Sequence, residues 1–424
     1  MKKRPLPLLV LLLILLSACG EETLNKENIT LYHATDMHYL SQQLTDNSDA
    51  FVEYIRQGDG KMVHCIEPIM EAFVTDVNKN KPDYLLVGGD ITFNGEKQSH
   101  IDIAEKFRKI EENGTQVLVL PGNHDVDYPF CFGYQGTQMY RTDRLLKEDF
   151  EKIYADYGLN QAYSRDKKSF SYFYRLTDKI TLLALDTNTA CGTAVRDPST
   201  LIWMENELKK IKDDVNVIAL THQTLVDHFP ENSMNNQYSI INGKAIIDIF
   251  EKYGVQFNLS GHIHTQHKAV EGNLTDIATE SLAVLPCNYG VIKITPENIT
   301  YSTQSTDVES WAEETSQTDV NLINFNEYAK DFYILSQSRL SMSALADENI
   351  TEEEKQVMSD FFAELNIYYF SGTMDDAYQH LSESEGYELW QEKGEDMWHF
   401  KYLMRRMQEG YLDLDHNSAE ITFK

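Results

Sequence analysis

Five short polar motifs in this chain each follow a run of residues typical of a buried β-strand. The motifs are Asp36-Met37-His38, Gly89-Asp90, Gly122-Asn123-His124-Asp125, Thr221-His222-Gln223 and Gly261-His262-Ile263-His264. The strand-like runs before them are residues 29–34, 84–87, 116–120, 217–220 and 255–259. Polar groups placed repeatedly at the carboxyl ends of strands predict one shared site at the edge of an open α/β sheet.

The side chains of these motifs are typical metal ligands. Carboxylate, carboxamide and imidazole groups are all present and thiolate is absent, which suits two hard or borderline divalent cations. In Gly261-His262-Ile263-His264, alternate residues of an extended chain project to one side, so both imidazoles can face one site. Each motif alone has an ordinary structural explanation, such as a turn at Gly122-Asn123 or a core histidine at His222. Their joint order favours a metal site.

The pattern from residue 28 to residue 303 alternates strand-like and helix-like segments. Amphipathic helices are expected at 62–78, 101–110, 201–211 and 245–253, and mostly β-structure at 278–285, 290–294 and 299–302. This alternation predicts two sheets covered by helices, a four-layer α/β/β/α domain spanning 28–303.

A polar segment, 304–319, then reads as a linker, and the character of the chain changes to helix after it. Apolar residues at helical spacing predict helices at 322–340, 351–370, 374–381 and 396–408. Residues 320–424 are therefore expected to form a small C-terminal all-α domain, which either docks a partner or caps the site.

The N-terminus has the pattern of an export signal. Lys2, Lys3 and Arg4 precede an apolar run at 6–16 that is too short to span a bilayer. Leu16-Ser17-Ala18-Cys19 resembles the lipobox of bacterial lipoproteins, which implies a signal peptide at 1–19, lipidation of Cys19 and a tether at 20–27. A plain signal peptide or a short anchor is the alternative. The expected location is the outer face of the bacterial cell membrane.

The charge of the chain limits its partners. The formal net charge is −30 over 424 residues, so nucleic acid polymers are not expected as partners because no basic stripe is present to bind phosphates. An anionic membrane would also repel this surface, so membrane association is expected through the lipid anchor only.

Four cysteines remain after Cys19. Cys131 and Cys191 lie in polar loops that contain glycine and are the favoured disulfide pair, while Cys65 and Cys287 complete the set. Free buried thiols are an equally good interpretation.

The ordered motifs resemble the calcineurin-like metallophosphoesterase superfamily, whose motifs are Asp-x-His, Gly-Asp, Gly-Asn-His-Asp/Glu, His and Gly-His-x-His. The resemblance covers residues 28–302 and implies a hydrolase of phosphate esters with two divalent metal ions, for which Mn, Fe, Zn and Co all suit the ligands. It implies one metal held by Asp36, His38 and His264 and the other by Asn123, His222 and His262. Asp90 would bridge both metals, His124 would be the catalytic imidazole, and Asp125 would orient it.

Differences among the branches of this superfamily narrow the expected substrate. Phe93 stands where purple acid phosphatases carry a tyrosine ligand, and no arginine follows Asp90 as it does in Ser/Thr protein phosphatases. The run Gly89-Asp90-Ile91-Thr92-Phe93-Asn94-Gly95-Glu96 looks most like class III cyclic-nucleotide phosphodiesterases, although Thr221-His222-Gln223-Thr224 departs from the His-His-Pro-Pro-like stretch of that branch.

The resemblance thus implies a phosphodiesterase that hydrolyses small phosphodiesters through attack of a metal-bridging hydroxide, with cyclic nucleotides as the best-supported example. A wall-polymer or lipid-headgroup diester is a further substrate class. The alternatives are a phosphomonoesterase acting on small extracellular phosphate esters, and a lipoprotein with a mainly partner-docking role through its helical domain. His228 and His267 belong to no motif and are expected on the surface.

Overall fold

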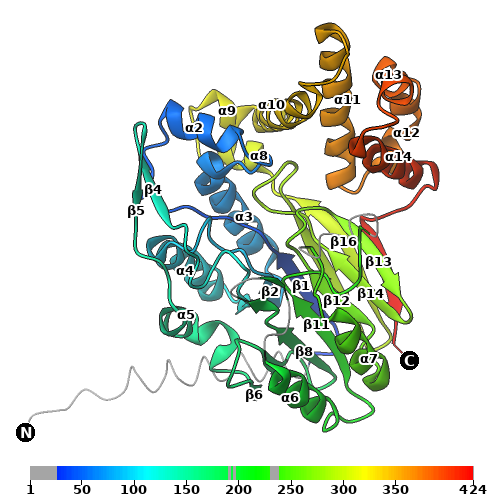
Figure 1. Cartoon of the computed structure of the whole chain (residues 1–424). Coiled ribbons are helices and arrows are strands. Elements are labelled where there is room, and N and C mark those ends of the chain that lie inside the picture. The colour runs from blue at the N-terminus through cyan, green and yellow to red at the C-terminus, as the bar shows by residue number, and fades with distance from the viewer. Residues whose placement is uncertain (1–25, 190–191, 194–196, 230–237, 424) are drawn as a thin grey trace, which may run out of the picture.

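The computed structural model describes residues 26–189, 192–193, 197–229 and 238–423. Two sheets pack face to face, with strand orders β17-β16-β15-β1-β2-β3 and β13-β14-β12-β11-β8-β7-β6 (Figure 1). The first sheet contains β1 Ile29–Ala34, β2 Tyr84–Val87, β3 Gln116–Val119, β15 Asn288–Ile294, β16 Asn298–Ser305 and β17 Ser418–Thr422. The second contains β6 Ser164–Arg165, β7 Tyr172–Arg175, β8 Ile180–Leu185, β11 Asn216–Thr221, β12 Phe257–Ser260, β13 His267–Glu271 and β14 Leu274–Ala278.

Helices cover the outer face of each sheet, which confirms the expected α/β/β/α fold (Figure 1). The first sheet is covered by α3 Ile66–Asn80 and α4 Lys97–Glu112, and the second by α6 Pro198–Leu208 and α7 Gly243–Tyr253. The two faces of β8 illustrate the layering: Leu182 belongs to the core shared by the two sheets, whereas Leu183 belongs to the core under α6 and α7. Alternating side chains of one strand therefore join two cores, as the period of a strand requires.

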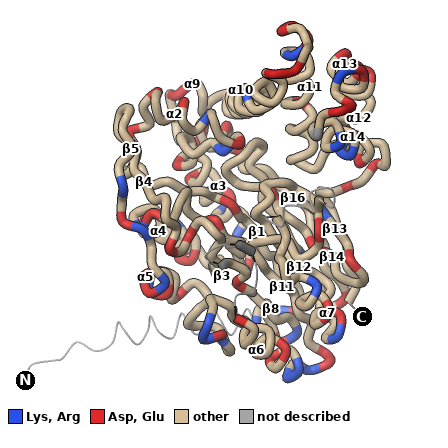
Figure 2. The backbone as a smooth tube through the Cα atoms, in the orientation of Figure 1, with Lys and Arg blue, Asp and Glu red and all other residues tan. Residues whose placement is uncertain are grey.

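Smaller elements complete the sheet-containing region. The helical ones are α2 Asp49–Arg56, the 3₁₀ turn Val63–Cys65, α5 Lys147–Ile153 and the π-helical turn Ala155–Leu159. Two short hairpins pair β4 Phe132–Gln135 with β5 Gln138–Arg141, and β9 Asn188–Thr189 with β10 Gly192–Thr193. Acidic residues lie along helices of several layers, for example α5 and α6 (Figure 2).

The strand directions explain where the motifs meet. β1, β2 and β3 are parallel, as are β8, β11 and β12 in the other sheet. Because the carboxyl ends of parallel strands lie at one edge, the motifs after β1, β2, β3, β11 and β12 lie together at one end of the sandwich.

The C-terminal region is helical, as expected, but its boundaries differ from the prediction. The helices are α8 Val308–Glu314, α9 Val320–Ile323, α10 Phe325–Leu345, α11 Glu352–Phe370, α12 Met374–Ser382, α13 Glu385–Lys393 and α14 Trp398–Tyr411. The segment 304–319, predicted as a linker, contains α8, whose first turn is capped by the Asp307 side chain at the Ser310 amide. The last residues are also not helical, since β17 pairs antiparallel with β16 and extends the first sheet.

Three further predictions are wrong. The segment 278–285, expected as strand, is strand only to Ala278 and continues as turns. His228 and His267, expected on the surface, are buried where the helical region meets the second sheet. Cys131 is a free thiol and donates to the Asn94 carbonyl, so the predicted disulfide is not formed by this residue. Cys191 and Cys19 lie outside the described residues. Among the residues that the structure describes, no helix has the length and apolarity needed to cross a membrane.

Candidate functional site

Five of the candidate ligands share an uncommon backbone conformation. Asp36, His38, Asp90, His262 and His264 have φ angles of 51°, 44°, 45°, 69° and 52°. A residue other than glycine pays on the order of 1–3 kcal/mol for such a conformation, and strain of this kind concentrates at functional sites. The turns after β1, β2 and β12 therefore hold these residues in backbone conformations that are unfavourable locally and that the surrounding structure must stabilise.

Close packing of the loops after β2, β3 and β11 explains a motif glycine. Gly89 has a φ of 100°, and a Cβ atom at this position would lie 2.6 Å from Nδ1 of His222 and 2.7 Å from the Gly122 amide nitrogen. Only glycine allows the loops after β2, β3 and β11 to approach one another so closely.

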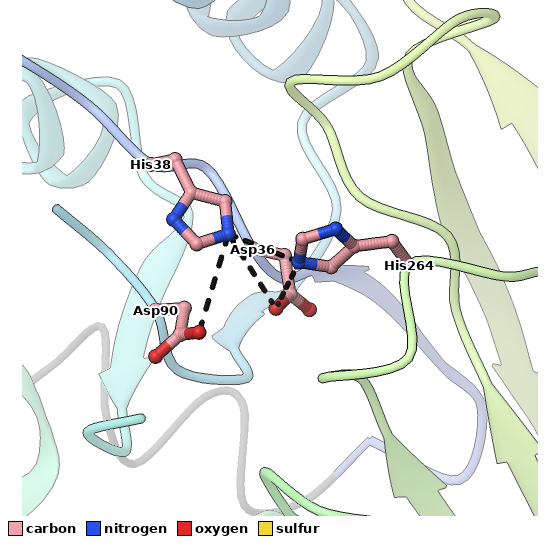
Figure 3. A group of neighbouring side chains, drawn as sticks. All are labelled: Asp36, His38, Asp90 and His264. Carbon is pink, nitrogen blue, oxygen red and sulfur yellow. Dashed lines mark hydrogen bonds and ion pairs between the residues drawn. The ribbon is translucent and has the colours of Figure 1, made fainter. Parts of the chain in front are cut away.

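The first group of candidate ligands surrounds the carboxylate of Asp36 (Figure 3). Its Oδ2 accepts a hydrogen bond from the His262 amide at 2.8 Å, while its buried Oδ1 has no hydrogen-bond partner. That oxygen lies 3.2 Å from Nε2 of His264 and 4.0 Å from Nε2 of His38. The two imidazole nitrogens are 3.0 Å apart, and Oδ2 of Asp90 lies 4.0 Å from His38. These converging buried atoms fit a divalent cation, which would satisfy all of them at once.

The second group lies on the other oxygen of Asp90. Oδ1 of Asp90 is 3.3 Å from Nε2 of His222, and the His262 ring lies 5.1 Å from the His222 ring. Nδ1–H of His222 donates to the Gly88 carbonyl at 2.9 Å, which leaves the lone pair of Nε2 directed toward the site. Oδ1 of Asn123 lies 3.1 Å from that nitrogen. Asp90 thus presents one oxygen to each group, as a carboxylate between two cations would.

The electrostatics of the site favour bound positive charge. Burial raises the pKa of the Asp90 carboxyl, but His222 and His124 outweigh burial and hold this pKa well below its usual range. Burial lowers the pKa of His222, but Asp90 and Asp36 outweigh it and raise this pKa to about 9. Two buried carboxylates that stay ionised need a compensating charge, which a proton on His222 or a divalent cation can provide.

The partners of His124 differ from the one expected, which was Asp125. Its Nδ1–H faces the Phe93 carbonyl at 3.0 Å and Oδ1 of Asn94 at 3.1 Å, and its ring lies 5.3 Å from the His38 ring. The expected orienting role of Asp125 is wrong, because the Asp125 carboxylate accepts from the backbone amides of residues 91, 92 and 122. Asp125 therefore fixes the loop that carries His124, and Asn94 with the Phe93 carbonyl orients the imidazole.

A profile of the family described as calcineurin-like phosphoesterase matches residues 29–266, more than half of the chain. The chain belongs to this family. In this calcineurin-like phosphoesterase, the matched stretch contains both groups of candidate ligands and His124. A second profile, described as the C-terminal domain of cyclic nucleotide phosphodiesterase, matches residues 307–413, which span α8 to α14.

Solved structures that align with this chain include two phosphatases. A dimetal phosphatase from Danio rerio aligns with a TM-score of 0.44 at 11% identity, covering 66% of this chain and 96% of that one. A purple acid phosphatase from yellow lupin seeds aligns with a TM-score of 0.46 at 12% identity, covering 66% of this chain and 52% of that one. No match was found among curated protein sequences.

Sequence reasoning missed the polar residues that border the motifs in space. Lys61 forms an ion pair with Asp59 at 3.2 Å. Burial lowers the pKa values of the His38 and His124 imidazoles, and the charge of Lys61 lowers them further. Oδ2 of Asp59 lies 3.6 Å from Nδ1 of His264. No periodicity or motif marks Lys61, because it follows α2 in a loop that approaches the site only in the folded phosphoesterase. Asn94, in contrast, lies within the 89–96 run that the sequence did single out.

A third buried group, His267, Glu409 and His416, joins the second sheet to α14 and the segment before β17. Nδ1 of His416 accepts a hydrogen bond from the Lys268 amide at 3.1 Å, so its proton resides on Nε2 and that nitrogen has no lone pair for a metal. The His267 and His416 rings stack at 4.0 Å. This group therefore fastens the two regions together and does not have the chemistry of a ligand set.

Proposed function

We propose that this calcineurin-like phosphoesterase is a phosphodiesterase that hydrolyses small phosphodiesters with the help of two divalent cations. Asp36, His38 and His264 would hold one cation and Asn123, His222 and His262 the other, with Asp90 between them. The observation that carries the proposal is the pair of ligand groups that share the two oxygens of Asp90. When bound, the cations would lower the pKa of a coordinated water and neutralise charge on the phosphoryl group.

The protein residues account for the proton transfer. Nδ1 of His124 is engaged by the Phe93 carbonyl and Asn94, which directs the free Nε2 lone pair to the reaction. Burial lowers the pKa of His124, so the neutral imidazole is available to accept a proton from the attacking water. The new oxygen–phosphorus bond forms as the bond to the alcohol breaks on the opposite side of the phosphorus; the departing oxygen takes a proton from solvent, and His124 then releases to solvent the proton that it accepted.

The preference for diesters over monoesters is part of this proposal. Its support is the match of residues 307–413 to a domain named for cyclic nucleotide phosphodiesterases, together with the sequence of the 89–96 run. The test uses metal-stripped protein reloaded with manganese and compares bis-p-nitrophenyl phosphate, 3′,5′-cyclic AMP and p-nitrophenyl phosphate. Turnover of the two diesters with little monoester turnover is expected. Dominant monoester turnover would make the protein a phosphomonoesterase instead.

Asn123→Ala is the inactive control variant for this assay. The substitution removes one ligand oxygen without adding bulk, so turnover should fall at least a hundredfold while the unfolding transition stays close to that of the parent protein. Near-parental turnover in this variant would refute the assignment of the site.

We also propose that the protein is exported and anchored to the outer face of the bacterial cell membrane by a lipid on Cys19, on the grounds of the lipobox-like sequence. Cys19→Ser should abolish incorporation of radiolabelled palmitate and release the protein from the membrane fraction. A variant that stays lipidated and membrane-bound would contradict this.

A further inference from the structure

A large cavity lies between the candidate metal centre and the helical region. Its volume is about 1060 Å³, and His262 and His264 line one end of it. This volume is at the upper end of the range of clefts that bind drug-sized ligands. The cavity therefore has room for considerably more than a phosphate group at the metal centre.

Helices α10 and α11 each line this cavity with residues of a single face. From α10, the lining residues Gln337, Leu340, Ser341 and Ala344 are spaced by three and four positions, which places them on one face. Phe362, Asn366 and Phe370 form a second stripe at intervals of four on α11. Figure 1 shows α10 and α11 as neighbouring helices of the C-terminal region. Two helices far along the chain thus supply the wall opposite the metal centre.

Aromatic rings from both regions line the cavity, and Arg406, which also lines it, packs against them. Phe229 comes from the loop after β11, and Tyr402 comes from α14. The buried Arg406 guanidinium carbon lies 3.3 Å from the Tyr402 ring centroid, 4.0 Å from that of Tyr369 and 5.5 Å from that of Phe229. A cation between rings in a desolvated position is stabilising, so Arg406 fixes the relative position of aromatic walls from two regions.

The polar groups of the wall bond to one another. The Tyr402 hydroxyl donates to Asn366 at 2.9 Å, the Asn366 amide donates to Gln337 at 3.0 Å, and the Gln337 amide donates to the Asp59 carbonyl at 3.2 Å. This series connects α14, α11 and α10 to the loop beside His264. Because these groups satisfy one another, this part of the wall offers a ligand mainly ring and aliphatic surface, while the charged side chains of Glu348, Lys393 and Asp396 also line the cavity.

We propose that this cavity binds the organic substituent of the substrate, a group that carries an aromatic ring, while the phosphate lies at the candidate metal centre. The inference rests on the proposed function and deepens it, since it names the class of diester that the site would select. Contacts with the rings of Phe362 and Phe370 supply the recognition, while Tyr402 supports them from within the wall, since Arg406 and Phe362 already pack on its ring. Rings held before binding lose little conformational freedom.

The test narrows the cavity and compares two diesters that share a leaving group. Ala344→Trp in the full chain adds an indole to the α10 wall, and methyl p-nitrophenyl phosphate and thymidine 5′-(p-nitrophenyl phosphate) release the same nitrophenol. We expect kcat/KM for the thymidine ester to fall at least tenfold and that for the methyl ester to stay within twofold. The matched control is Leu335→Trp, because nine positions along α10 place Leu335 on the opposite, exposed side of the helix. This control should leave both rates unchanged.

A binding measurement separates this inference from the proposed function. On the manganese-loaded protein, calorimetry with thymidine 5′-monophosphate and with inorganic phosphate needs no diester turnover. Ala344→Trp should weaken binding of the nucleotide at least tenfold and leave that of phosphate within twofold, and Phe370→Ala, which removes a ring without adding bulk, should weaken the nucleotide alone. Absence of diester turnover with this pattern would refute the diesterase only. Equal effects on nucleotide and phosphate, or no effect on either, would refute the cavity assignment.

Discussion

The buried carboxyl group of Glu96 is the most informative probe of stability near the site. Its side chain is inaccessible to solvent at the start of α4, where Oε2 accepts the Asn94 amide at 3.0 Å and Oε1 has no hydrogen-bond partner. Burial raises the pKa of Glu96 from 4.5 to about 7, against the opposing effect of the Asn94 amide. The folded protein therefore binds this proton more tightly than the unfolded chain does.

The sign and the size of the effect follow from this difference. Between pH 4.5 and about 7 the folded state holds the proton of Glu96 and the unfolded state has lost it, so stability falls as pH rises through that window. The full shift corresponds to about 3 kcal/mol. Glu96→Gln keeps the size and an acceptor for Asn94 but cannot ionise. We expect the variant to exceed the parent in unfolding free energy by about 1 kcal/mol at pH 5.5 and by about 3 kcal/mol at pH 8.

Urea unfolding of metal-stripped protein at pH 5.5, 6.5 and 8 measures this difference. The control is Glu112→Gln on the same helix, where the side chain is 62% exposed and pairs with Arg108 at the surface; its effect should stay within about 0.5 kcal/mol at every pH. A Glu96→Gln advantage that does not grow with pH would refute the argument that burial keeps this carboxyl protonated.

Two other substitutions test the surroundings of the site. Lys61→Met removes the cation beside His38 and His124 and should lower kcat/KM for bis-p-nitrophenyl phosphate by roughly tenfold to a hundredfold. Lys61→Arg should recover most of the rate, and unchanged kinetics in Lys61→Met would show that this charge does not contribute to catalysis. Arg406→Met removes the guanidinium packed on Tyr402 and should lower the free energy of unfolding in urea by about 2 kcal/mol. The control Arg339→Met, at a surface pair with Glu53, should lower it by less than about 1 kcal/mol. Equal losses would show that the buried cation adds nothing to stability.

The sequence predicted the layered fold and the meeting of the motifs because both depend on local patterns. Strand-like runs that end shortly before Asp36, Asp90 and Asn123 are visible without any partner, and parallel strands present their carboxyl ends at one edge of a sheet, so the motifs were expected to meet. The same reasoning failed at the ends of the C-terminal region, since β17 contains only Ser418–Thr422 and becomes a strand by pairing with β16. A short polar segment does not reveal a distant partner.

Burial and hydrogen bonding between distant residues were decided by the tertiary structure. His228 and His267 have no local feature that separates them from surface histidines, yet their Nδ1 atoms lie 2.9 Å apart in a buried junction. The family resemblance implied that Asp125 orients His124, but the two side chains take different partners in the folded loop.

The sequence by itself therefore determined the fold class, the order of the motifs and the types of candidate ligand, because these follow from periodicity and residue chemistry along the chain. Only the tertiary structure decided that Lys61 and Asp59 approach the candidate metal ligands, and that α10, α11 and α14 line the cavity beside them. Helical periodicity shows that a face is apolar but not what it packs against, since that choice depends on how all the elements fit together in space.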